Sequence, residues 1–534
     1  INIMKNNYIK RIIGFSYAHA ALFLLAFGLF LRLNHFFENR SFWLDEAYVA
    51  LNLTHLSLKD ILLFVPFLGP QASPPMLFLF TEKLFMLLLG NNEIVLRAFP
   101  VLCSVLSLVL FYFFCIKYLN KKSLLLVLSV FVLSEPLIYY AAELKPYSTD
   151  LLFSLILYLS FPFKKENILG FKEILFLGGL GSISIFFSYP SVFILASIGL
   201  ILLIRSVTTG KKTDPIKVLI ICFWWLLNVF FLYSVAIKTL FKDDALVQII
   251  NLANFFPAVP FTSLENTALF IKCLFKNMIS PLGIMPLSLW TIITCLGIVN
   301  IFQKDKEKFF LFAAPIFLAL AASLVQKYPF VPRFLIFLVP SYLLFLSAGI
   351  ETLFRQPFFS RRSIKLAIII VLLFQPLQDM TNSFINGRED EDTRSIMQQF
   401  QKNYKKGDAI FLNRHAIYGF GYYRGVLKMG EENLPMLKIV FNNNNNEKQY
   451  STYVARYFFN KDGFLSGFLE DDNLLKDSAK IMWRNNPSTW VILTHIKEND
   501  KEILIHSLNE QGKMKISYEA KGAYLYLYDL SDPK

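Results

Sequence analysis

The sequence predicts a polytopic α-helical membrane protein with a C-terminal soluble α/β domain. Hydrophobic residues make up 55% of the 534 residues and aromatic residues 16%, which is too apolar for an ordinary soluble protein. Apolar stretches recur about every 25 to 30 residues and are long enough to cross a bilayer. After Asn382 these stretches end, and the composition becomes charged and mixed.

The apolar stretches predict about eleven membrane spans. The first is too long for the core of a signal peptide and has no small-residue cleavage site, so we expect it to remain as a span. Between Lys172 and Arg205 we expect a short helical hairpin that is broken at Tyr189-Pro190. The expected spans are 12–33, 95–116, 123–141, 146–162, 173–188, 189–204, 218–237, 282–301, 309–326, 333–350 and 364–380.

The segment Pro74–Gly90 decides the topology. It is apolar but short, and it carries Glu82 and Lys83 in its middle. If it is an amphipathic helix in the interface, the short loops of one face hold about 20 Lys and Arg, against about 11 on the other face. This bias predicts an inside N-terminus, a transmembrane domain over 1–382 with a large first external loop at 34–94, and an external domain over 383–534.

Charge and cysteine usage exclude several function classes. The net charge is +14, but the basic residues lie in short loops rather than in a patch, so no nucleic-acid partner is expected. The five cysteines lie in or beside apolar segments and lack metal-ligand spacing. The sequence contains no phosphate-binding glycine loop, dinucleotide fingerprint or zinc-protease helix. These absences argue against an ATP-driven pump and an intramembrane metalloprotease.

The C-terminal region has the pattern of an α/β domain. Short apolar runs predict strands at 409–412, 490–494 and 523–528, and helices are expected at 393–404 and 501–510. The asparagine run at 442–446 is interpreted as a loop.

Asp45 and Glu46 are the first candidates for a functional site. They stand side by side just beyond the first span, where charge is costly to keep near hydrocarbon. A neighbouring carboxylate also raises the pKa of each acid, which suits a general base. A solvated loop that happens to be acidic is the alternative interpretation.

Three other motifs share the predicted outer face: Glu143-Leu-Lys-Pro-Tyr147, Ser188-Tyr-Pro190 and Lys327-Tyr-Pro-Phe-Val-Pro-Arg333. Each has a proline at or near the start of a helix, so each points a helix N-terminus toward this face. Helix N-termini combined with Lys145 and Arg333 are suited to holding phosphate. Ordinary helix starts and cations that snorkel to the interface remain the alternative for any single motif.

These motifs, in this order and spacing, resemble GT-C-fold glycosyltransferases of the bacterial family 39 type. That type includes proteins similar to protein O-mannosyltransferases and to the lipid A aminoarabinose transferase. The resemblance covers roughly residues 12 to 380 and also includes Gln71-Ala-Ser-Pro-Pro75 and Asn91-Asn-Glu-Ile-Val-Leu-Arg97. Ser73 and Tyr189 stand where relatives have other residues, which leaves the donor and acceptor open.

The resemblance implies transfer of a sugar from a polyprenyl-phosphate donor to a lipid, glycan or protein acceptor, outside the bacterial cytoplasmic (inner) membrane. Asp45 would be the catalytic base of an inverting reaction, and Glu46 and Glu143 would orient the acceptor, tune Asp45 or hold a possible divalent cation; no other cofactor is expected. The residues expected to bind donor phosphate and substrate are Glu143, Lys145, Tyr147, Tyr189, Tyr328 and Arg333.

Two other function classes compete with this interpretation. A transporter or flippase of a lipid-linked or anionic sugar would show internal repeats and charges near mid-membrane. A polymerase or ligase of surface polysaccharide on another helical fold would not need the acid pair after the first span. The sequence shows no repeat, and its acids lie at the ends of spans.

Overall fold

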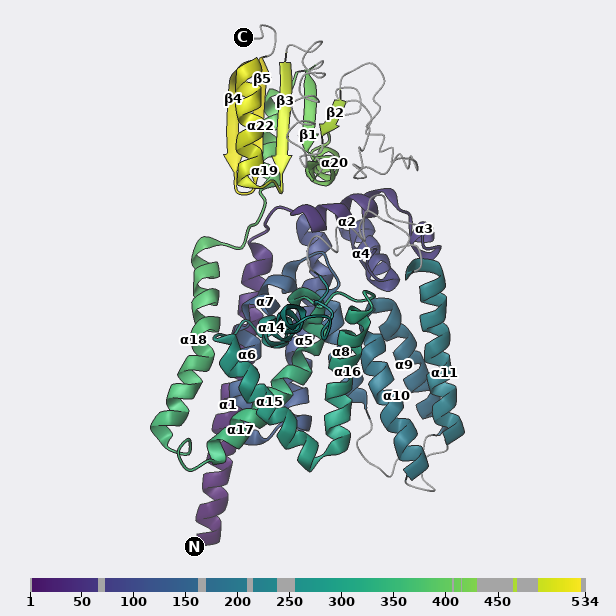
Figure 1. Ribbon diagram of the computed structural model, residues 1–534, viewed down its shortest axis with the longest axis vertical. Coiled ribbons are helices and arrows are strands. Elements are labelled where there is room, and N and C mark those ends of the chain that lie inside the picture. Colours follow the sequence, from purple (N-terminus) through teal and green to yellow (C-terminus); the bar gives the residue numbers. More distant parts are fainter. Residues whose placement is uncertain are drawn as a thin grey trace.

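The computed structural model consists of a helical bundle, a layer of short helices at one end of the bundle, and a C-terminal domain beyond that layer (Figure 1). It describes residues 2–65, 73–161, 170–208, 215–237, 255–405, 408–413, 415–429, 464–467 and 488–529. Helix α1 begins at the end of the bundle opposite to the C-terminal domain, as an odd number of spans requires.

Helices occupy every predicted span. The helices of the bundle are α1 (Asn2–Phe37), α5 (Glu93–Tyr118), α6 (Lys121–Leu133), α7 (Glu135–Tyr139), η1 (Tyr140–Ala142), α8 (Tyr147–Ser160), α9 (Phe171–Phe187), α10 (Ser191–Thr208), α11 (Pro215–Leu232), η2 (Tyr233–Ile237), α14 (Leu264–Ile279), η3 (Ser280–Leu282), α15 (Leu287–Lys304), α16 (Lys306–Leu324), η4 (Pro332–Leu338), α17 (Val339–Arg355) and α18 (Arg362–Asn386).

Seven of the helices described are long and apolar enough to cross a membrane, and the bent pair formed by α6 and α7–η1 gives an eighth. The remaining predicted spans correspond to the shorter helices α8, α9 and α10. The predicted break lies between α9 and α10, at Ser188–Pro190. The chain is therefore a polytopic helical membrane protein.

Two glycines allow α15 and α17 to cross closely. A Cβ atom on Gly297 would lie 1.8 Å from the carbonyl oxygen of Phe345, and one on Gly349 would lie 1.8 Å from that of Ile293. Small residues at a crossing let two helix backbones approach each other within a membrane. Any larger side chain at either position would push the two helices apart.

The layer at the end of the bundle is built from α2 (Leu44–His55), α3 (Leu58–Leu62) and α4 (Met76–Leu89). Helix α4 is the predicted interfacial helix and begins directly after Pro75. Its Lys83 ammonium donates to the carbonyl of Leu53 in α2 at 2.6 Å. This bond ties the two longer helices of the layer together.

The C-terminal domain holds a five-stranded sheet in the order β2-β1-β3-β5-β4. Strand β1 pairs in parallel with β2 and β3, while β5 is antiparallel to β3 and β4. The elements are α19 (Thr393–Asn403), β1 (Ala409–Asn413), α20 (Ala416–Val426), β2 (Phe464–Gly467), β3 (Ser488–Thr494), α22 (Glu498–Gln511), β4 (Lys513–Ala520) and β5 (Ala523–Asp529).

The predicted strands at 409–412, 490–494 and 523–528 and the two predicted helices are all confirmed. Helices α2, α3, α14 and α20 and strands β2 and β4 were not predicted. The asparagine run at 442–446 lies outside the described residues, as does Gln71.

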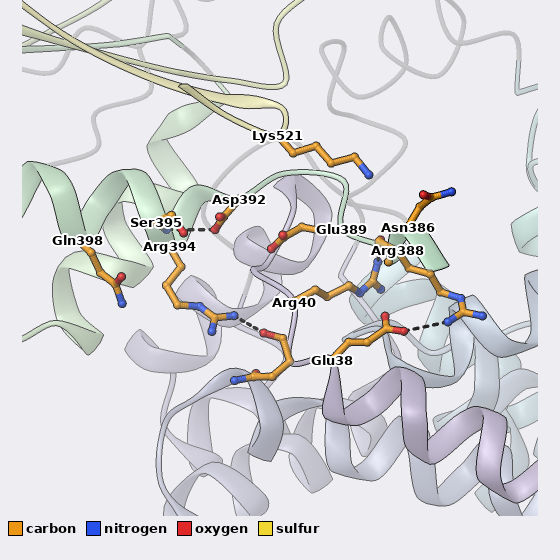
Figure 2. A pocket seen from close by; sticks show the side chains of 12 residues that line it. Glu38, Arg40, Asn386, Arg388, Glu389, Asp392, Arg394, Ser395, Gln398 and Lys521 are labelled. Carbon is orange, nitrogen blue, oxygen red and sulfur yellow. Dashed lines mark hydrogen bonds and ion pairs between the residues drawn. The ribbon is translucent and has the colours of Figure 1, made fainter. Parts of the chain in front are cut away.

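An acidic and basic segment between α18 and α19 joins the C-terminal domain to the bundle (Figure 2). Arg388 pairs with Glu135 at 2.7 Å and with Glu38 at 3.0 Å, and Arg394 pairs with Glu93 at 2.8 Å. A cavity of about 490 Å³ lies at this junction, between the end of α1, the start of α19 and Lys521. Ion pairs therefore fix the C-terminal domain to the same loop that carries the acid pair.

Candidate functional site

Helix α2 brings the acid pair to the end of the bundle. It begins at Leu44, whose backbone N–H donates to the Glu391 carboxylate at 3.1 Å. Asp45 and Glu46 therefore occupy the first turn, where a negative charge is favoured by the helix dipole. Successive positions on a helix point in different directions, so the two acids have different surroundings.

Asp45 forms an ion pair with Arg333, with 3.2 Å between Oδ2 and Nη1. The side chains are 17% and 24% exposed respectively, so the pair is reachable but largely shielded from water. The guanidinium of Arg333 also lies over the rings of Phe255 and Phe334, at 5.4 and 5.3 Å. Arg333 stands at the start of η4, which leads into α17.

Glu46 is completely buried and is held by Arg97. The guanidinium of Arg97 donates to both carboxylate oxygens, at 2.7 and 2.5 Å, and the backbone N–H of Leu144 donates at 2.9 Å. Burial alone would raise the pKa of Glu46, but the charges of Arg97 and Arg40 outweigh it and lower the pKa. These contacts make Glu46 an anchor between the first loop, α5 and the Glu143 turn.

Glu143 lies in the turn before α8 and is also fully buried. The indole N–H of Trp43 donates to its Oε1 at 3.2 Å, while its Oε2 has no hydrogen-bond partner among the described residues. Burial and the nearby negative charge of Glu46 raise the pKa of Glu143 to about 8. The Glu143 carboxyl therefore keeps its proton to higher pH than an ordinary glutamate, and in that form it can donate a hydrogen bond.

Lys145 follows in the same turn and is 8% exposed. Its ammonium makes no hydrogen bond or ion pair with any residue that the structure describes, although the charges of Asp45, Arg333 and Glu143 act on it. Burial lowers its pKa. A buried cation without a partner is costly, and a bound anion would remove that cost.

The three predicted tyrosines have different positions. Tyr147 lies beside Tyr140 and Phe334, with ring centroids 4.9 and 5.9 Å away, so it borders Arg333. The hydroxyl of Tyr189 donates to the carbonyl of Pro74 at 3.3 Å, and that of Tyr328 donates to the carbonyl of Phe334 at 2.7 Å. The structure thus places Tyr147 with the charged residues, and Tyr189 and Tyr328 as supports of α4 and η4.

Sequence reasoning missed Arg97, Trp43, Glu391 and His495. Trp43 directly precedes α2, and His495 follows β3 with its Nδ1 2.5 Å from Glu391 Oε1. The only signal was weak: Trp43 lies within the acid-pair motif and Arg97 ends another motif. Nothing local in the sequence connects residue 495 to residue 45.

The described residues contain no group of three or more His, Cys, Asp or Glu side chains that could hold a metal ion. Two acids of the site are paired with arginine instead: Glu46 with Arg97, and Asp45 with Arg333. In chemical terms, the site offers a shielded carboxylate, a neutral acid and two cations. That combination can accept a proton from a hydroxyl and hold a phosphate.

Fold and site together define a class of protein: a polytopic helical membrane protein with a cluster of ionisable residues between the helical bundle and a C-terminal sheet domain. No protein-family model and no curated protein sequence matches the chain. Solved structures do match. The apo crystal structure of ArnT from Cupriavidus metallidurans has a TM-score of 0.51 and 9% identity, covering 98% of this chain and 100% of ArnT.

A second ArnT structure from Cupriavidus metallidurans, bound to undecaprenyl phosphate, gives a TM-score of 0.52 at 9% identity. It covers 96% of this chain and 97% of ArnT. The chain therefore has the GT-C fold of ArnT over nearly its whole length. The fold expectation from the sequence is confirmed, including the C-terminal sheet.

Proposed function

We propose that the protein is a membrane glycosyltransferase that moves a hexose or pentose from a polyprenyl-phosphate donor to a hydroxyl of a lipid, glycan or protein. The observation that carries this proposal is the Asp45–Arg333 pair, which joins a carboxylate to a cation at 3.2 Å. An inverting transfer needs both a base for the attacking hydroxyl and a cation for the departing phosphate. The GT-C fold shared with ArnT supports it.

In the proposed reaction Asp45 takes the proton from the acceptor hydroxyl. The acceptor oxygen attacks the anomeric carbon from the side opposite to the phosphate, forming a new glycosidic bond with inverted configuration. The bond between the anomeric carbon and the phosphate oxygen breaks, and the polyprenyl phosphate leaves with that electron pair. Arg333 and Lys145 stabilise its charge.

The remaining predicted residues receive supporting roles. Glu143 in its neutral form donates a hydrogen bond to a substrate oxygen from Oε2, which has no partner in the described part of the chain. Tyr147 borders the phosphate site, and Tyr189 and Tyr328 hold α4 and η4 in place through their carbonyl contacts. Glu46 positions Asp45 through its pair with Arg97 rather than reacting itself.

We place the reaction on the periplasmic side of the bacterial inner membrane, with residues 383–534 as a periplasmic domain. The odd number of predicted spans and the charge bias of the loops support this orientation. A reporter fused after Asn382 should be active only in the periplasm. Activity in the cytoplasm would contradict the orientation.

The proposal is tested by incubating the purified protein in lipid with a panel of labelled polyprenyl-phosphate sugars and candidate acceptors, with and without a chelator. Transfer by the wild type and its loss in Asp45→Asn would support the proposal. Movement of the donor across vesicles without any transfer would instead favour the transporter. Loss of transfer with the chelator, restored by added cation, would indicate a divalent metal.

A further inference from the structure

The C-terminal domain is fixed against the loop that carries Asp45. The hydroxyl of Tyr423 in α20 accepts from the backbone N–H of Phe42 at 2.8 Å and donates to Glu93 at 2.9 Å. The ring of Phe42 also packs on Tyr422, with centroids 5.1 Å apart. These atoms are buried, so residues of the C-terminal domain near α2 have defined positions relative to it.

His495 is one of these residues, and its backbone is unusual. It directly follows β3 and has a φ of 50°, a left-handed conformation that costs energy for a residue other than glycine. Nδ1 of its ring lies 2.5 Å from Glu391 Oε1. The other oxygen of Glu391 accepts from the N–H of Leu44 at 3.1 Å. One carboxylate therefore joins His495 to the residue that precedes Asp45.

The imidazole lies at the outer side of the site. Its centroid is 6.4 Å from that of Trp43, whose indole N–H bonds Glu143, and 5.2 Å from that of His415. The side chain is 46% exposed, so a ligand arriving from solvent can reach it. Because Nδ1 is held by Glu391, Nε2 is the ring nitrogen that has no hydrogen-bond partner among the described residues.

Building on the proposed function, we infer that His495 is a positioning residue for the acceptor: an O–H or N–H group of the acceptor other than the reacting hydroxyl donates a hydrogen bond to Nε2. The Glu391 carboxylate keeps the proton on Nδ1, which leaves the Nε2 lone pair available. The C-terminal domain is then part of the acceptor site. The donor site, formed around Arg333 and Lys145, does not need it.

The acceptor KM should depend on pH, because only a neutral imidazole can accept a hydrogen bond at Nε2. The groups that act on the ring are Glu391 and Asp390 from the joining segment, Asp45 from α2 and His415 at the start of α20. The hydrogen bond to Glu391 raises the pKa of His495, partial burial lowers it, and the acids raise it further, so the pKa lies above its usual value. The KM for the acceptor should fall as the pH rises through this pKa.

The test measures KM for acceptor and for donor from pH 5.5 to 8 in wild type, His495→Ala, His495→Gln and Glu391→Gln. We expect His495→Ala to raise the acceptor KM about three- to tenfold, the value of one neutral hydrogen bond, to remove the pH dependence and to leave the donor KM unchanged. Glutamine at 495 keeps an acceptor atom and should restore part of the loss. Glu391→Gln keeps a hydrogen bond to Leu44 but removes the negative charge beside His495. It should therefore move the midpoint of the pH dependence of the acceptor KM to lower pH.

His506→Ala is the matched control, because this exposed histidine lies on α22 and pairs only with Glu510 among the described residues. Equal effects at 495 and 506, or an unchanged acceptor KM in both His495 variants, would overturn the inference. If His495→Ala fails to fold, His495→Gln decides through the loss of the pH dependence, and Glu391→Gln decides through the shift of the pH midpoint. Absence of transfer by the wild type with every donor would instead refute the proposed function.

Discussion

Arg333 forms an ion pair with Asp45. The two residues are 288 positions apart in the chain, yet Nη1 of Arg333 lies 3.2 Å from Oδ2 of Asp45. The proposal assigns Arg333 to the phosphate of the donor and Asp45 to the acceptor. A donor that draws the guanidinium away would therefore also free the carboxylate to act as a base.

Replacing Asp45 with asparagine should reduce transfer about 10²- to 10⁴-fold, the usual contribution of a general base, because the amide cannot take the proton. The measurement is the rate of transfer from a labelled polyprenyl-phosphate sugar at saturating donor. Asp60→Asn is the control, since Asp60 is a half-buried acid of the same loop that pairs with Ser57 rather than with the site. A rate within a few-fold of wild type for Asp45→Asn would contradict the assignment.

The same Asp45→Asn protein should bind undecaprenyl phosphate more tightly than wild type, because Arg333 no longer has a charged competitor. Arg333→Ala should weaken that binding about ten- to hundredfold, the value of a charge-assisted hydrogen bond. Both changes are measured by equilibrium binding in nanodiscs. The double variant should bind undecaprenyl phosphate no more tightly than Arg333→Ala alone. Tighter binding by the double variant would mean that the effect of asparagine at 45 does not act through Arg333.

Glu143→Gln should keep most of the activity below pH 7.5, because glutamine imitates the neutral acid. The pKa of Glu143 is raised to about 8 by burial and the charge of Glu46, so the wild-type carboxyl loses its proton, and its donor capacity, as the pH rises through 8. The turnover rate of wild type should fall over that range. Glutamine at 143 should remove this alkaline fall, and an unchanged profile would exclude Glu143 as its source.

Glu46→Gln should destabilise the protein by about 3–5 kcal/mol, the usual cost of removing one partner of a buried ion pair. In the wild type the Arg97 guanidinium lies 2.7 and 2.5 Å from the two Glu46 carboxylate oxygens. In the variant Arg97 would keep its charge but lose this negatively charged partner. Thermal unfolding in detergent measures the loss. Adding Arg97→Met should recover part of the stability, whereas a fully stable single variant would show that Arg97 finds other partners.

Much of the fold could be predicted because hydropathy is a local property. Each predicted span contains a helix, and the three predicted strands are present. Helix α14 escaped prediction because one of its faces is exposed and it has no long apolar run. Helix α20 contains glycines and adjacent aromatics that do not favour a helix locally; its burial against α2 stabilises it instead.

The site was predictable only in part, for a physical reason. Asp45, Glu143, Lys145 and Arg333 stood out because charge is costly to keep near hydrocarbon and because the predicted topology brings their loops to one face. The pairing of the charged side chains could not be predicted, since Arg97 and Arg333 lie far along the chain from their partners Glu46 and Asp45. The joining segment at Arg388–Asp392 was expected to begin the external domain, but its pairing with Glu38 and Glu135 depends on packing that no local pattern encodes.

The glycine contact between α15 and α17 limits how the site can move. Arg333 precedes α17 by only a few residues in η4, and α17 rests on α15 with backbone against backbone at Gly297 and Gly349. Such a crossing leaves no compressible side chains through which one helix could slide past the other. We therefore expect Arg333 to exchange partners by rotation of its own side chain, and the proposed lipid carrier to bind beside a helix crossing that stays fixed.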